Sequence, residues 1–203
     1  MRLHDYLPSG NGYKIRLLQS FLRQPFQLLE YDIIRGETRT SAFLALNPNG
    51  KVPVLEISPT KALCESNAIL YYLAQTTPYW PVDTWHQAQA MQWLNFEQYS
   101  HEPNIATLRF WRKLPSLTQW QQDNIHQKQT AGYAALAVLE QHLGSQDFLV
   151  ANTLSIADIA LYAYTHVASE GGFDLNRFPA VKAWLQRIAD HPHYIDIHSR
   201  EIA

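Results

Sequence analysis

The sequence predicts an α/β domain followed by an all-helical domain, and three observations lead to that prediction. In the first third of the 203 residues, short strand-like and helix-like segments alternate in the order βαβαββα. A stretch with two prolines at 77–81 cannot continue a helix. Beyond it, apolar residues recur at helical spacing. We therefore expect domains at residues 1–76 and 84–203, joined by a short linker.

Each element of the first domain has a local cause. A turn rich in Pro, Ser, Gly and Asn at 8–12 leads into a helix whose apolar residues recur at helical spacing up to the break before Pro25. A short helix over 40–46 ends at an Asn-Pro-Asn-Gly turn, and another helix begins near Glu65. Strands are predicted at residues 2–6, 26–31, 52–57 and 61–64.

The second domain reads as helices throughout. Residues from about 85 to 111 form one or two long helices. The last clear helix ends before His191 and Pro192. Apolar faces mark further helices around residues 133–143, 156–167 and 181–188.

The composition is that of an ordinary globular protein, with 46% hydrophobic residues and a formal charge of −2. Because neither sign of charge forms a long run, nucleic acid and membrane surfaces are not expected partners. The first residues lack an apolar secretory stretch, and no segment is apolar for long enough to span a bilayer. We expect a cytoplasmic protein with a small-molecule partner.

Two neighbouring features suit an extended peptide ligand. Val52 and Pro53 open a strand, and a cis bond there would turn the backbone groups of Val52 outward to pair with a peptide. The alternative is a proline that merely starts an edge strand. Glu65 and Ser66 lie where a strand ends and a helix begins. This corner can accept a carboxylate at the helix start and an ammonium group at the Glu65 side chain. The alternative there is that Ser66 only caps its own helix.

The turn at Ser9, Gly10 and Asn11 leads into the first helix. A sulfur placed there would meet the positive end of the helix together with hydroxyl and amide donors, which favour the thiolate over the thiol. The alternative is an ordinary turn, because these residues are what turns are made of.

Four segments stand out along the chain: LHDYLPSGNGYK at 3–14, NPNGKVPVL at 47–55, LCESNAI at 63–69 and LSIADIA at 154–160. In this order they resemble the cytosolic glutathione transferases of bacteria, and the resemblance spans nearly the whole chain. It implies a thioredoxin-like βαβαββα domain followed by a helical bundle. The late segment contains a capping-box pattern from Ser155 to Asp158, so Asp158 is interpreted as structural.

The resemblance implies a role for each residue of the glutathione site. Val52, before the cis-proline Pro53, would pair with the cysteinyl backbone of glutathione. Glu65 and Ser66 would hold the γ-glutamyl group, and Lys51 could approach the glycine carboxylate.

The residues that activate the thiol follow from the same resemblance. The Pro-x-x-Asn-Gly loop is similar to that of nu-type members, which implies Asn11 and Ser9 as hydrogen-bond donors to the sulfur. Tyr6 is the rival, because mammalian-type members use a tyrosine near the end of the first strand. The loop contains no cysteine, and Cys64 is interpreted as a small buried side chain.

A pocket for an apolar electrophile is expected beside the thiol, lined by the first loop and the first long helix of the second domain. An equally available interpretation places any one of these residues in the core or in a subunit interface. The candidates are Tyr6, Tyr13, Tyr99, His101, Arg109 and Phe110. A metal site at His191, His193 and His198 lacks supporting cysteine or carboxylate spacing and is not predicted.

The function that the resemblance implies is conjugation of glutathione to apolar electrophiles, as in detoxification. Glutathione acts as co-substrate, no metal or prosthetic group is needed, and a homodimer is expected. Glutathione-dependent disulfide reduction and a non-catalytic glutathione-binding role remain the alternatives.

Overall fold

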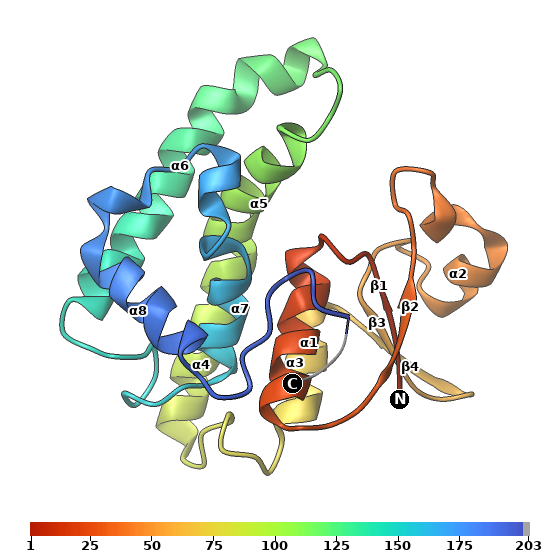
Figure 1. Cartoon of the computed structure of the whole chain (residues 1–203), viewed down its shortest axis with the longest axis horizontal. Coiled ribbons are helices and arrows are strands. Elements are labelled where there is room, and N and C mark those ends of the chain that lie inside the picture. The colour runs from red at the N-terminus through yellow and green to blue at the C-terminus, as the bar shows by residue number, and fades with distance from the viewer. Residues whose placement is uncertain (201–203) are drawn as a thin grey trace. The chain divides into compact units, whose positions relative to one another are not determined.

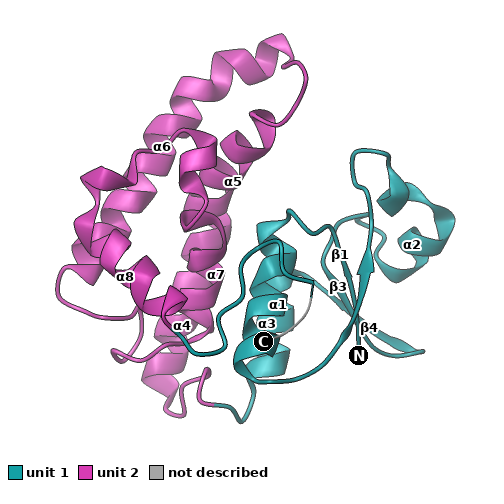
Figure 2. Cartoon of the chain, viewed as in Figure 1, with its two compact units in different colours: residues 1–77, 191–203 teal, residues 78–190 magenta. Residues whose placement is uncertain are grey.

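The structure is a computed structural model that describes residues 1–200, and it divides into two compact units (Figure 2). Unit 1 comprises residues 1–77 together with the C-terminal segment from His191, and unit 2 comprises residues 78–190. The α/β and all-helical parts expected from the sequence are thus both present.

Unit 1 has the predicted order βαβαββα, with one additional 3-10 turn, η1 (Glu37–Arg39). The strand expected from residue 52 begins only at Val54, because Pro53 has no N–H to donate to a neighbouring strand. The elements are β1 (Arg2–Asp5), α1 (Gly10–Phe21), β2 (Gln27–Glu30), α2 (Ser41–Leu46), β3 (Val54–Ser58), β4 (Lys61–Cys64) and α3 (Ser66–Ala74).

The four strands form one mixed sheet in the order β2-β1-β3-β4. β1 runs parallel to β2 and antiparallel to β3, and β4 completes the sheet antiparallel to β3. Helices α1 and α3 contact each other on one face of the sheet, and α2 lies on the other face (Figure 1). Leu3 and Leu55, which pair across β1 and β3, are fully buried on the face that α1 and α3 cover. Val54 is fully buried on the opposite face, together with its partner His4, whose ring contacts Phe43 of α2.

The segment after His191 departs from the expected domain ranges, which placed it with the helical domain. It returns to unit 1 and lies along α1. There the Tyr13 hydroxyl donates to the Ile195 carbonyl at 2.6 Å, and the Ser20 hydroxyl donates to the His193 carbonyl at 2.7 Å. We call residues 191–199 the C-terminal strap.

Unit 2 is helical throughout (Figure 1). The stretch expected as one or two helices over 85–111 is two helices joined by a π-helical turn, η2 (Glu97–His101). None of the helices within residues 1–200 is long and apolar enough to cross a membrane. The unit contains α4 (Thr84–Phe96), α5 (Glu102–Trp111), α6 (Gln119–Leu143), α7 (Ile156–Thr165), α8 (Pro179–Ala189) and the 3-10 turns η3 (Ala168–Gly171) and η4 (Leu175–Arg177).

Helix α7 is the centre of unit 2, since all ten of its residues are buried. Ser155 and Asp158 form the capping box that the sequence predicts at its start. The Asp158 carboxylate also accepts hydrogen bonds from the Leu149 backbone N–H at 2.9 Å and from the Trp184 indole at 3.0 Å. Asp158 therefore fixes α7, the preceding loop and α8 to one another, as its structural interpretation requires.

Candidate functional site

The register of the sheet brings the two peptide-binding features together. Val54 on β3 pairs with Cys64 on β4. Pro53 directly precedes β3 and Glu65 directly follows β4, so this antiparallel pair brings the Val52–Pro53 segment to the same end of the sheet as the corner Glu65–Ser66. The Val52–Pro53 peptide bond is cis. The start of β3 and the junction between β4 and α3 therefore form one edge of unit 1.

The loop before α1 lies at the same edge. β1 pairs with β3 through His4 and Val54, so the chain that leaves β1 after Asp5 emerges beside the start of β3. The Ser66 hydroxyl donates a hydrogen bond to Asn11 Oδ1 at 3.0 Å, although the two residues are 55 positions apart. The thiol-activating loop and the γ-glutamyl corner expected from the sequence are in direct contact.

Glu65 holds a backbone conformation that non-glycine residues rarely adopt, with φ at 68° and ψ at 114°. Ser66, which follows it, is the first residue of α3 and is nearly fully buried. Its hydroxyl bonds to Asn11, so the alternative in which Ser66 only caps α3 does not describe this corner. The Glu65 side chain is exposed at the same place.

Lys14 is a member of this site that the sequence analysis did not identify. Its side chain is fully buried, and its ammonium donates to Ser66 Oγ at 3.2 Å and to Asn67 Oδ1 at 3.3 Å. The signal was its position three residues after Asn11, which places both on one face of a helix. Only the apolar periodicity of this helix entered the prediction.

Ser9 is the N-cap of α1. Its hydroxyl oxygen accepts from the Gly12 N–H at 3.4 Å, and its own N–H donates to the Tyr6 carbonyl at 2.7 Å. Ser9 thus has the turn and capping role that its residue type favours. Because the oxygen is the acceptor in this cap, the hydroxyl hydrogen can still be donated to a ligand.

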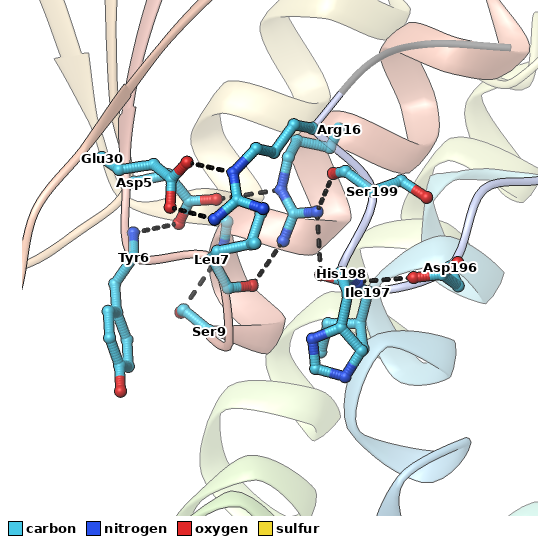
Figure 3. A network of polar contacts seen from close by, with 12 residues as sticks. Asp5, Tyr6, Leu7, Ser9, Arg16, Glu30, Asp196, Ile197, His198 and Ser199 are labelled. Atoms are coloured by element: carbon cyan, nitrogen blue, oxygen red, sulfur yellow. Dashed lines mark hydrogen bonds and ion pairs between the residues drawn. The ribbon is translucent and has the colours of Figure 1, made fainter.

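A buried ion pair between Arg16 and Asp5 supports the loop that precedes α1 (Figure 3). Arg16 on α1 donates from Nε to Asp5 Oδ2 at 3.0 Å and from its terminal nitrogens to three carbonyls: Leu7 at 2.7 Å, Ile197 at 3.0 Å and Ser199 at 2.9 Å. Burial raises the pKa of the Asp5 carboxyl to about 6, and the Arg16 charge offsets part of that rise. One guanidinium therefore holds the end of β1, the loop and the C-terminal strap.

Two of the residues expected around the electrophile belong to unit 1. Tyr6 is partly buried directly after β1. Tyr13 is fully buried and its hydroxyl is bonded to the C-terminal strap, so it is a core residue and not a wall of an open pocket. Its helical position could not reveal this, because the strap is 182 residues away in the sequence.

The other four belong to unit 2, and two of them are core residues. His101 Nε2 is 2.9 Å from Thr165 Oγ1, and Arg109 is paired with Glu170 at 2.8 Å. Both side chains are buried, which agrees with the core interpretation and not with the pocket interpretation. Tyr99 and Phe110 do carry open surface, with 88% and 40% of their areas exposed.

Cys64 is partly buried at the end of β4, and its sulfur lies 3.7 Å from the Leu46 carbonyl. Burial, together with the neighbouring Glu65 charge, raises the pKa of the Cys64 thiol. A raised pKa lowers the thiolate fraction, so Cys64 is poorly suited to act as a nucleophile. No group of three or more His, Cys, Asp and Glu side chains that could hold a metal ion occurs within residues 1–200.

Family models match both parts of the chain. The glutathione S-transferase N-terminal domain matches residues 1–75, and the glutathione S-transferase C-terminal domain matches residues 97–192.

Solved structures agree with the family models. A possible glutathione S-transferase from Rhodopseudomonas palustris is 46% identical, with a TM-score of 0.93 over 100% of this chain and 91% of that chain. A glutathione S-transferase from Pseudomonas fluorescens is 45% identical, with a TM-score of 0.94 over 98% of each chain. Ure2p in complex with S-p-nitrobenzylglutathione is 25% identical, with a TM-score of 0.84 over 94% of this chain and 90% of that chain.

Three curated relatives carry different names. The glutathione S-transferase-like protein LUC7 of Fusarium is 30% identical over 92% of this chain and 87% of its own length. Maleylacetoacetate isomerase of Pseudomonas aeruginosa is 28% identical over 98% and 95%. The disulfide-bond oxidoreductase YfcG of Escherichia coli is 29% identical over 92% and 89%. With two family models that together cover most of the chain, this protein belongs to the glutathione S-transferase family.

Proposed function

We propose that the chain is an enzyme that binds glutathione at the edge formed by Val52, Glu65 and Ser66 and transfers its thiolate to apolar electrophiles. The observation that carries the proposal is the 3.0 Å hydrogen bond between Ser66 and Asn11. It joins a corner suited to a γ-glutamyl group to the start of α1, where a cysteinyl sulfur would be activated. The complex of Ure2p with S-p-nitrobenzylglutathione supports a glutathione derivative as the ligand of this fold.

The proposed binding mode assigns each end of the tripeptide to a chemical partner. The Val52 backbone would pair with the cysteinyl residue as an added strand. The Glu65 carboxylate would receive the γ-glutamyl ammonium group. The first backbone N–H groups of α3, which begins at Ser66, would receive the γ-glutamyl carboxylate. The exposed Lys51 side chain, which directly precedes Val52, would approach the glycine carboxylate.

The proposed chemistry is attack by the glutathione thiolate on an electrophilic carbon. Asn11 and Ser9 would donate hydrogen bonds to the sulfur and, with the N-terminus of α1, lower its pKa. The thiol proton passes to solvent, a carbon–sulfur bond forms, and the leaving group departs with its electron pair. The reaction as proposed uses glutathione as co-substrate and requires no resident metal or prosthetic group.

Tyr6, which lies in unit 1 together with the proposed glutathione site, is the side chain to test for the electrophile. Replacing Tyr6 with alanine should raise KM for an apolar electrophile and leave KM for glutathione unchanged, because only the second substrate is proposed to contact it. The buried His101 and Arg109 are not included, since their loss would disturb the core of unit 2.

A second candidate function is glutathione-dependent disulfide reduction, which the similarity to YfcG favours. The loop at 8–12 contains no cysteine, so the disulfide exchange would run between glutathione molecules and the substrate disulfide. Parallel assays of chloronitrobenzene conjugation and of mixed-disulfide reduction separate the two candidates. Retention on glutathione-agarose without either activity would favour a binding protein.

Asn11→Ala tests the mechanism directly. We expect kcat to fall much more than the affinity for glutathione, by roughly 10–100-fold, because a donor to the developing thiolate is lost while the peptide contacts remain. An unchanged kcat would remove Asn11 from the mechanism. We also propose that the protein is cytoplasmic and forms a homodimer. Light scattering of the pure protein tests the homodimer.

A further inference from the structure

A short chain of hydrogen bonds crosses the proposed glutathione site. It runs from the Lys14 ammonium to Ser66 Oγ at 3.2 Å and from the Ser66 hydroxyl to Asn11 Oδ1 at 3.0 Å. Lys14 is fully buried and Ser66 nearly so, which places a positive charge behind the site where little water screens it. A buried lysine in this position calls for a functional explanation.

The Lys14 ammonium group sets the donor-to-acceptor direction of these hydrogen bonds. An ammonium group only donates, so Ser66 Oγ accepts from Lys14 and passes its own hydrogen to Asn11. The charge of Lys14 also favours the oxygen end of the Asn11 amide on the side of Ser66, because that end of the amide dipole is negative. The amide nitrogen of Asn11 is then the end turned away from Ser66.

We infer that Lys14 is a positioning residue which, through Ser66, fixes the Asn11 amide so that its N–H donors face the sulfur of a bound γ-glutamyl thiol. The inference rests on the proposed function and deepens it. An amide nitrogen donates to a thiolate and stabilises it, whereas an amide oxygen in the same place would repel it. The side of the Asn11 amide that faces the ligand therefore decides whether Asn11 activates the thiol.

Lys14→Met tests this role, because methionine keeps an unbranched side chain and removes the ammonium group. Gln19→Met is the matched control on the same helix. The Gln19 side chain is also fully buried, and neither polar atom of its amide has a hydrogen-bond partner within residues 1–200. The readout is the pKa of the bound glutathione thiol, followed by the ultraviolet absorbance of the thiolate during a pH titration.

We expect Lys14→Met to raise the pKa of the bound thiol by about one unit, and Gln19→Met to leave it at the wild-type value. In an Asn11→Ala background, Lys14→Met should cause no further rise, because its effect passes through Asn11. An equal rise in that background would mean that the Lys14 charge acts on the sulfur directly, and would overturn the inference. A wild-type thiol pKa in the Lys14→Met single variant would also overturn the inference.

If Lys14→Met does not fold, Ser66→Ala tests the same inference. It breaks the same chain in the middle, so it should raise the thiol pKa to a similar extent; an unchanged pKa would overturn the inference. Calorimetry separates this failure from that of the proposed function. Wild-type protein that binds glutathione, with an unshifted Lys14→Met variant, rejects only the role of Lys14. Wild-type protein that does not bind glutathione rejects both.

Discussion

Glu65 combines an unfavourable backbone conformation with a side chain at the centre of the proposed ligand site. Its φ of 68° and ψ of 114° lie outside the regions that residues with a Cβ prefer, at a cost of roughly 1–3 kcal/mol. Glycine at this position would avoid that cost. The presence of glutamate instead of glycine is explained if its carboxylate is needed to bind the ligand.

Glu65→Gly should therefore stabilise the protein and weaken its ligand binding at the same time. We expect the free energy of unfolding to rise by about 1 kcal/mol and the Kd for glutathione to rise about tenfold. Thr76→Gly is the matched control, because Thr76 has a φ of 61° and an exposed side chain that is not part of the site. Urea unfolding measures the stability of both variants, and calorimetry measures their Kd for glutathione. An unaltered Kd for Glu65→Gly would contradict the account.

At the scale of single residues, short-range signals were informative and long-range ones were absent. The capping role of Asp158 follows from its spacing to Ser155 within one segment. Lys14 has a local signal in its spacing to Asn11, but its contact with Ser66, 52 residues away, has none. Tyr13 was misplaced because its partner belongs to the C-terminal strap. A helical pattern shows that a residue faces inward, but not which distant segment it meets.

At the scale of elements, Asp158 joins three segments of unit 2. Its carboxylate accepts from the Leu149 N–H, the Trp184 indole, and both the N–H and the hydroxyl of Ser155, at 2.9–3.0 Å. Burial raises the pKa of Asp158 to about 6, and these four donors offset part of the rise by favouring the carboxylate.

Asp158→Ala should lower the free energy of unfolding by roughly 3 kcal/mol or more, because four buried donors lose their acceptor. The exposed Asp123 on α6 provides the control, and its replacement by alanine should change stability by less than about 0.5 kcal/mol. Equal urea midpoints for the two variants would show that the capping box does not hold unit 2 together.

Glu170 makes the link between α5 and η3 sensitive to pH. Burial tends to raise the pKa of this carboxyl, but hydrogen bonds and charge from Lys113 and Arg109 outweigh burial and lower it. A carboxyl whose pKa is depressed in the folded state contributes stability above its unfolded pKa, near 4.5, and loses it as pH falls through the folded value.

Glu170→Gln should consequently destabilise the protein near neutral pH by no more than about 1 kcal/mol, since 37% of the Glu170 side chain is exposed and solvent screens the pair. The difference from wild type should shrink as the pH falls below about 4.5. Urea unfolding at a series of pH values measures it. A difference that grows on acidification would have the wrong sign.

The order of elements in unit 1 was predictable because each strand and helix there carries its own pattern and its own turn. The π-helical turn η2 between α4 and α5 was not, since residues 97–101 contain no glycine or proline that would mark an interruption of the helix. The strand expected at 52–57 started too early, because alternation alone does not register the missing N–H of Pro53.

At the scale of the whole molecule, the C-terminal strap makes unit 1 depend on the far end of the chain. Arg16, Tyr13 and Ser20 on α1 all donate to strap carbonyls, and Ile195 and Ile197 are buried. These pairs are 173–183 residues apart, so no local pattern predicts them. The expected domain range of 84–203 followed sequence order, whereas the chain returns to unit 1 at its end.

Truncation after Asp190 should therefore destabilise unit 1 by several kcal/mol, because the buried Arg16 loses two acceptors and apolar surface is uncovered. Tyr13→Phe removes only one hydroxyl from the same contact and should cost about 1 kcal/mol. Since Arg16 also holds the Leu7 carbonyl, the truncated protein should bind glutathione more weakly. A truncated protein with wild-type stability and affinity would show that the strap has no supporting role.

The measurement that tests the central claim most directly is calorimetric titration of the folded wild-type protein with glutathione. The contact between Ser66 and Asn11, beside Val52 and Glu65, predicts saturable binding below millimolar concentration. Folded protein that releases no heat and shows no saturation at millimolar glutathione would contradict the assignment of this edge as a tripeptide site.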